Sequence, residues 1–191
     1  MPTLRDLDWP LRTPRLVVRP SHVGDADALY AVRTHPAIAP WAYSVPVSLQ
    51  QWRERYADPA TAAGLLTAEL GGEVVGELMI AVHDADAHRE VSDAAAGTVG
   101  ELGWLVAPQH QGQGLATEAA RALLDLCFGP LGLRRVVAST LEDNRASARV
   151  MEKLGMRLET RSRRSTLHRD LGWIDGRVYA LLAEEWPGAA G

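Results

Sequence analysis

The sequence contains a single cysteine, a single phenylalanine and no long apolar run. One cysteine excludes an internal disulfide and fits the reducing conditions of a cytoplasm. A helix needs about 20 consecutive apolar residues to cross a bilayer, so we expect no membrane-spanning segment and no membrane partner. Residues 1–6 lack the apolar core of a signal peptide, which also favours a cytoplasmic location.

The chain also lacks an excess of positive charge. Its 20 Lys and Arg residues against 24 Asp and Glu residues give a formal net charge of −4, which argues against a nucleic-acid partner. The histidines and aspartates of residues 83–97 match no recognised ligand spacing, so no metal site is expected. The length of 191 residues suits one domain. We therefore expect a single domain over residues 1–191, with residues 183–191 as a frayed tail.

The most informative stretch covers residues 101–128. Apolar residues alternate with others up to Val106, which predicts a strand, and Pro108 should end it because proline has no N–H for a ladder. An alanine- and leucine-rich stripe at helical spacing then predicts a helix over residues 115–128. Cys127 lies on this stripe, so we predict a core residue and not a nucleophile.

A turn with two glycines joins this strand to this helix. Glycine adopts positive φ and lets a ligand approach the backbone, while a helix N-terminus presents unpaired N–H groups and the positive end of its dipole. Together they predict a cradle for an anion such as a pyrophosphate. Its donors are the backbone N–H groups of Gln111, Gly112, Gln113, Gly114, Leu115 and Ala116. No Gly-Lys-Ser/Thr follows, which excludes a P-loop, and the third glycine of a dinucleotide fingerprint is missing.

The order Gln-x-x-Gly-x-Gly, after a strand that ends in Pro and before an Ala-rich helix, resembles the acetyl-coenzyme A loop of the GNAT superfamily of N-acetyltransferases. A second segment, Asn144-x-x-Ser147 followed by Glu-Lys-Leu-Gly, is similar to the second cofactor segment of that family. Residues 13–20 and 173–181 resemble the ribosomal-protein N-terminal (RimJ/RimL-like) acetyltransferase branch. The resemblance covers nearly the whole chain. It implies acetyl-CoA as co-substrate and direct transfer of the acetyl group to a primary amine in a ternary complex.

Periodicity and turn signals also predict the order of elements. Strands are expected near residues 16–18, 64–70, 73–82, 98–106, 135–140, 156–169 and 173–182, the last two as a hairpin, and helices over residues 25–34, 48–57, 115–128 and 144–155. Gly71 and Gly72 predict a hairpin, and residues 83–97 an exposed loop. The fold class is therefore α+β, a mixed, mostly antiparallel twisted sheet of about six to seven strands with helices on both faces and one parallel crossover at the cofactor site. This order matches the GNAT layout.

The resemblance implies roles for individual residues. The main chain of Leu105 and Val106 would pair with the pantetheine arm, and the missing side chain of Gly103 would leave room beside the thioester. Glu101 lies on the same strand face as Gly103, so we predict that it takes the proton of the acceptor ammonium, directly or through water. The alternative is a carboxylate that only holds the ammonium. Asn144 would contact the pantetheine, unless it serves only as a helix cap.

The family's usual proton donor to the thiolate is a tyrosine seven positions after the Asn, and here that position is Met151. Ser147 lies one helical turn after Asn144 and is the local substitute, unless its hydroxyl only caps the helix or faces water. Tyr179 is a weaker candidate, for which a core position is the alternative. The loop before the second helix carries Trp41 and Tyr43, which we assign to acceptor binding. Simple packing is the alternative for Trp41.

Several alternatives stay open at this point. The acceptor amine could be a protein N-terminus or a small molecule. Another acyl donor, such as succinyl-CoA, would need an arginine near the acyl pocket, and the arginines of residues 157–169 leave this alternative open. A non-catalytic acyl-CoA-binding or RNA-contacting module is the alternative from a different class, although the acidic net charge argues against RNA. Dimers are common in the branch, so a homodimer is an expectation by analogy alone.

Overall fold

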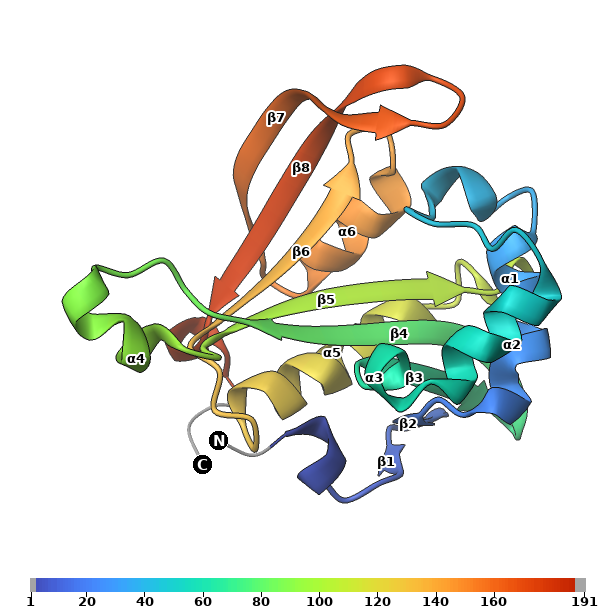
Figure 1. Ribbon diagram of the computed structural model, residues 1–191, viewed down its shortest axis with the longest axis horizontal. Coiled ribbons are helices and arrows are strands. Elements are labelled where there is room, and N and C mark those ends of the chain that lie inside the picture. The colour runs from blue at the N-terminus through green and yellow to red at the C-terminus, as the bar shows by residue number, and fades with distance from the viewer. Residues whose placement is uncertain (1–2, 188–191) are drawn as a thin grey trace. The chain divides into compact units, whose positions relative to one another are not determined.

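The structure is a computed structural model that describes residues 3–187 (Figure 1). The chain folds into two compact units, which we describe separately. The first, here called the cradle unit, comprises residues 3–80 and 103–123; the second, the hairpin unit, comprises residues 81–102 and 124–187. Hydrogen bonds link the strands in the order β1-β2-β3-β4-β5-β6-β8-β7. Strands β4 (Glu73–His83) and β5 (Val99–Val106) and helix α5 (Leu115–Phe128) contribute residues to both units.

The strands of the cradle unit are antiparallel neighbours. They are β1 (Leu11–Arg12), β2 (Leu16–Pro20), β3 (Leu65–Leu70) and the first part of β4. The β3–β4 connection is the predicted hairpin, with Gly71 at φ 60° and Gly72 at φ 87°. Positive φ at both central residues belongs to the tight turn that suits the twist of a hairpin, and glycine adopts it without strain.

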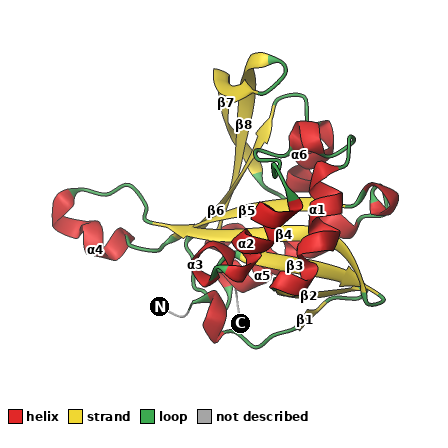
Figure 2. Ribbon diagram, turned by 45° about the vertical axis from the view of Figure 1, so that its right-hand side comes forward, coloured by secondary structure: helices red, strands yellow, loops and turns green. Residues whose placement is uncertain are grey.

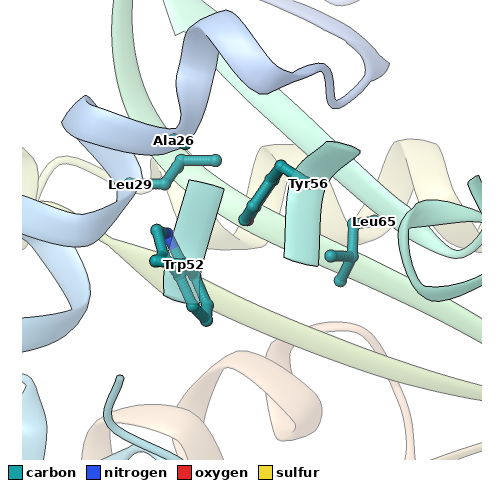
Figure 3. Packing of buried hydrophobic residues seen from close by; sticks show 5 residues of the cluster. All are labelled: Ala26, Leu29, Trp52, Tyr56 and Leu65. Atoms are coloured by element: carbon teal, nitrogen blue, oxygen red, sulfur yellow. The ribbon is translucent and has the colours of Figure 1, made fainter. Parts of the chain in front are cut away.

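Helices α1 (Ala26–Thr34), α2 (Leu49–Ala57) and α3 (Pro59–Ala62) complete the cradle unit, with the 3₁₀ turns η1 (Leu4–Asp6), η2 (Val23–Asp25), η3 (Ala39–Trp41) and η5 (Pro108–His110). Ser48 caps α2 by accepting a hydrogen bond from the backbone N–H of Gln51 at 3.2 Å. Side chains of α1, α2 and β3 form a buried cluster, shown in Figure 3: Ala26, Leu29, Trp52, Tyr56 and Leu65. This cluster fixes both helices against the strand.

The hairpin unit contains a parallel pair of strands. Residues 99–101 of β5 run parallel to residues 135–137 of β6 (Arg135–Leu141), as predicted for a crossover through a helix. Strand β8 (Gly172–Leu182) is antiparallel to β6, and β7 (Arg157–His168) is antiparallel to β8. Figure 1 shows β7 and β8 as a long twisted hairpin in orange and red. Helix α6 (Arg145–Lys153) follows β6.

Three features differ from the sequence-based expectation. The sheet has eight strands and not six to seven, because the two-residue β1 is too short to show any periodicity. Residues 83–97 are not only loop: they include η4 (Arg89–Val91) and the four-residue α4 (Ser92–Ala95), visible in Figure 2. The expected frayed tail begins with η6 (Ala183–Glu185), and Trp186 is buried, with its Nε1 donating to Asp125 at 2.8 Å. Residues 188–191 of that tail lie outside the described residues.

Within residues 3–187, none of the helices combines the length and the apolar character that crossing a bilayer requires.

Candidate functional site

The strand that leads into the glycine turn ends at Val106, as Pro108 predicts. Beyond it, the N–H of Ala107 donates to the carbonyl of Val75 on β4 at 2.8 Å. A Cβ atom at Gly76 would lie 2.6 Å from the carbonyl oxygen of Leu105, so only glycine allows β4 and β5 to approach so closely here. The main chain of Leu105 and Val106, predicted to face the pantetheine arm, is therefore held against β4.

The turn itself has the backbone that its two glycines predict. Gly112 has φ 74° and Gly114 has φ 80°, which other residues rarely adopt. The space beside Gly112 is open, since a Cβ atom there would meet nothing within 4 Å. Two glutamine side chains brace the turn: Gln111 Nε2 donates to the carbonyl of Val106 at 3.0 Å, and Gln113 Nε2 to that of Gln109 at 3.2 Å. The turn is thus both exposed and fixed in shape.

Helix α5 begins directly after this turn. Its first helical hydrogen bond runs from the N–H of Glu118 to the carbonyl of Gly114 at 3.0 Å. The N–H groups of Leu115, Ala116 and Thr117 therefore precede the helical ladder and have no acceptor within the helix. Their partial positive charge, together with the helix dipole, favours an anion at this end. The geometry supports the predicted cradle in its backbone conformation.

A contact that the sequence patterns did not reveal lies beside this turn. Arg15, which precedes β2, donates through Nε to Oε2 of Glu118 at 2.7 Å and through Nη1 to the carbonyl of Gln113 at 2.9 Å. Thr13 Oγ1 also donates to Glu118, at 2.6 Å. No local pattern could have predicted contacts between residues about one hundred positions apart.

The space beside Gly103 is narrower than expected. A Cβ atom at this position would lie 3.4 Å from Cε of Met79 and 3.6 Å from its Cβ, which is ordinary van der Waals contact. The missing side chain of Gly103 therefore faces Met79 within the cradle unit. Met79 therefore limits the space beside Gly103 on this side.

The predicted acceptor loop carries exposed aromatic side chains. Trp41, at the end of η3, is 38% exposed, and Tyr43 is 66% exposed. Arg33 of α1 ties the loop down, because its Nη1 donates to the carbonyl of Ser44 at 3.0 Å. The same guanidinium forms a two-point ion pair with Glu77 of β4, whose side chain is only 4% exposed. The loop is thus anchored to a buried charge pair.

Glu101 lies in the hairpin unit, on the part of β5 that pairs with β6. Its side chain is 37% exposed, and its Oε2 is 3.5 Å from Nε2 of His83, the last residue of β4. Sequence reasoning placed His83 in a polar loop and missed this contact. A carboxylate next to an imidazole can pass a proton on as well as receive one.

The second predicted segment also lies in the hairpin unit. Asn144 caps α6, with its Oδ1 accepting from the N–H of Ser147 at 3.1 Å. The cap uses the side-chain carbonyl oxygen of Asn144. The alternative role predicted for Asn144, that of a helix cap, is therefore observed. Ser147 is half-buried, whereas Met151 is completely buried. Tyr179 is also buried, and its hydroxyl donates to Oε1 of Glu152 at 3.1 Å.

The strand, the glycine turn and the start of α5 lie within a region of the chain that matches a known protein family. Residues 15–157 match the family described as acetyltransferase (GNAT) domain, and the chain belongs to this family. It is therefore an acyltransferase of the N-acetyltransferase type.

Individual relatives extend this similarity. "Uncharacterized N-acetyltransferase YnaD" of Bacillus subtilis is 40% identical over 86 residues, which span 45% of this chain and 50% of YnaD. "Putative ribosomal N-acetyltransferase YdaF" of the same organism is 32% identical over 145 residues, 73% of this chain and 69% of YdaF. The solved structure of Mycobacterium smegmatis RimJ in complex with CoA-disulfide has a TM-score of 0.72 at 28% identity, covering 95% of this chain and 90% of RimJ. The resemblance to the RimJ/RimL-like branch is thus confirmed.

Proposed function

We propose that this protein moves the acetyl group of acetyl-coenzyme A directly to a primary amine in a ternary complex. The acceptor would be a protein N-terminal α-amine or a small-molecule amine. The observation that carries this proposal is the turn after β5, where two positive-φ glycines precede three helix N–H groups without a helical acceptor. An exposed backbone cradle of this kind suits the paired phosphates of coenzyme A.

The cradle residues would bind the donor through the main chain. The N–H groups of residues 111–116 are the proposed phosphate donors, and the backbone of Leu105 and Val106 is proposed to hold the pantetheine arm. Asn144 is proposed to add a contact to that arm. Acetyl-CoA supplies the thioester; the chain binds it, orients it and keeps it beside the acceptor amine.

Two proton movements remain for side chains. We assign to Glu101 the removal of the proton from the acceptor ammonium, since an amine must be neutral to attack. We also assign to His83, whose Nε2 lies 3.5 Å from Oε2 of Glu101, the transfer of that proton to solvent. Ser147 is assigned the delivery of a proton to the departing thiolate, because Met151 cannot donate one.

The acceptor side is assigned to Trp41 and Tyr43. Their exposure on an anchored loop supports this role, because large aromatic side chains give contact area with little loss of conformational freedom. The name of YdaF, a putative ribosomal N-acetyltransferase, favours a protein over a small molecule as acceptor.

One experiment tests the whole proposal. Purified protein is incubated with acetyl-CoA and a panel of peptides with free N-termini, amino acids and polyamines, and free thiol release is measured. We expect release that depends on one acceptor class, and a lower rate with succinyl-CoA as donor. Tight binding of acetyl-CoA with no release for any amine would instead favour a non-catalytic binding module.

The role of Glu101 has its own test. Glu101→Gln should lower kcat by about 10²- to 10⁴-fold, the usual contribution of a general base, and should remove the acidic limb of the pH–rate profile. An unchanged profile would reduce Glu101 to a residue that only holds the ammonium. His83→Gln should shift the same limb without abolishing turnover.

A further inference from the structure

The carboxylate of Glu118 is held by residues from the other end of the cradle unit's sequence. It accepts hydrogen bonds from Oγ1 of Thr13 at 2.6 Å, from the backbone N–H of Arg15 at 2.8 Å and from Nε of Arg15 at 2.7 Å. These partners lie 103 to 105 positions earlier in the chain. We call Thr13, Arg15, Glu118 and the carbonyl of Gln113 the Arg15 clasp. It joins the start of β2 to the first turn of α5.

The clasp also sets the orientation of one peptide group in the glycine turn. Nη1 of Arg15 donates to the carbonyl of Gln113 at 2.9 Å, and Nη2 lies 3.6 Å from where a Cβ of Gly114 would be. In a planar trans peptide the carbonyl and the following N–H point in opposite directions. Because the carbonyl of Gln113 points to Arg15, the N–H of Gly114 points away from it. Arg15 therefore fixes the direction of one of the proposed phosphate donors.

The clasp has an electrostatic consequence as well. A carboxylate in the first turn of α5 is favourable for the helix alone, but it would oppose a second anion at the same helix end. Burial by itself would raise the pKa of Glu118, but the hydrogen bonds from Thr13 and Arg15 hold it below its usual value. The carboxylate is thus ionised at neutral pH and is neutralised by the guanidinium 2.7 Å away. The helix end keeps its positive character.

We propose that Arg15, held by Glu118, is a positioning residue for coenzyme A: it turns the N–H of Gly114 toward the pyrophosphate and cancels the Glu118 charge beside it. This inference rests on the proposed function and names the residues that shape its anion cradle. Arg15 acts through the Gln113–Gly114 peptide and not by touching the reacting atoms.

The test compares donors with and without the pyrophosphate. The KM and kcat of Arg15→Gln are measured with acetyl-CoA and with S-acetylpantetheine, which lacks the pyrophosphate and the 3′-phosphoadenosine attached to it. We expect the KM for acetyl-CoA to rise about tenfold, in line with loss of a hydrogen bond from a charged group, while kcat stays near wild type. Values of kcat/KM for S-acetylpantetheine should not change. Arg15→Lys should recover part of the loss, because lysine keeps the charge but lacks the planar fork.

Matched variants separate positioning from general stability. Arg53→Gln is the control, since the exposed side chains of Arg53 on α2 and Asp27 on α1 form a similar two-point pair in the same unit. It should leave both donors unaffected. If Arg15 and Glu118 act as one device, Arg15→Gln combined with Glu118→Gln should lose no more than the worse single variant.

The outcomes distinguish this inference from the proposed function. Equal losses with both donors, or a KM for acetyl-CoA unchanged in Arg15→Gln, would overturn the positioning role while leaving the enzyme an acetyltransferase. If the wild-type protein neither binds coenzyme A nor releases thiol from either donor, the proposed function fails first.

Discussion

Replacing Arg33 by methionine should destabilise the protein far more than the same change at Arg53. Both arginines form a two-point ion pair: Arg33 with Glu77 and Arg53 with Asp27. The pairs differ in burial. The side chains of Arg33 and Glu77 are 14% and 4% exposed, whereas those of Arg53 and Asp27 are 47% and 57% exposed. The comparison therefore isolates the effect of burial on the stability that each ion pair contributes.

The magnitude follows from the charge that remains after substitution. Arg33→Met leaves Glu77 buried without its partner, and breaking a buried pair in this way costs about 3–5 kcal/mol. Arg33 also donates to Ser44 and lies 5.2 Å from the ring centroid of Trp52, and both contacts are lost with it. For a chain of this length, about 2–4 °C per kcal/mol translates the cost into a fall in Tm of roughly 6–20 °C. Arg53→Met leaves no buried charge without a partner, so Tm should stay nearly unchanged.

The assay is thermal unfolding followed by circular dichroism at pH 7, with the double variant Arg33→Met and Glu77→Met as a third sample. The double variant should regain much of the loss, because no unpaired charge is left. Arg33→Met should also raise the KM for the acceptor, since Arg33 anchors the loop of Tyr43. Equal Tm shifts for Arg33→Met and Arg53→Met would refute the argument from burial.

Four further predictions follow from the two units. Gly112→Ala should weaken coenzyme A binding and cost about 1–2 kcal/mol, because Gly112 has φ 74°; Gly103→Ala, whose Cβ would make ordinary contact with a methionine, should change stability little by comparison, as denaturant titration can show. Burial raises the pKa of Cys127 to about 12, so the folded protein should not react with a thiol reagent at pH 8, and rapid labelling would contradict this. Ser147→Ala should lower kcat and leave the Kd for coenzyme A unchanged, and a wild-type kcat would eliminate Ser147 as the proton donor. Burial alone would raise the pKa of Asp25, but the hydrogen bonds that Asp25 accepts lower this pKa below its value in the unfolded chain. The contribution of Asp25 to stability is therefore present above about pH 4 and is lost as the pH falls further. The Asp25→Asn variant should lose less stability than the wild type between pH 5 and pH 3.

Features that depend on neighbouring residues were predictable from the sequence. Gly71 and Gly72 specify a tight hairpin because both central positions need positive φ, and Pro108 ends β5 because it lacks an N–H. The cap at Ser48 and the start of α5 follow similar local rules. The backbone of the cradle was predictable for this reason, since it consists of a strand end, a glycine turn and a helix start.

Contacts between distant segments were not predictable in this way. Arg15 meets Glu118, and His83 meets Glu101, because sheet pairing and helix packing bring separate stretches together. Each side chain on its own resembles an ordinary surface charge. Single-sequence patterns carry no information on which distant charge will be its partner, so both contacts appear only in the folded chain.

The proposed proton donor to the thiolate could be predicted only in part from the sequence. Sequence alone left Ser147 and Tyr179 as candidates, with Met151 in the usual place of a tyrosine. The structure separates them by burial and by existing bonds. Tyr179 is 2% exposed and its hydroxyl is already bonded to Glu152, whereas Met151, at 0% exposure, packs as an ordinary core residue of α6. Ser147 lies four residues before Met151 on the same helix face and is only half-buried, so it stays the proposed proton donor.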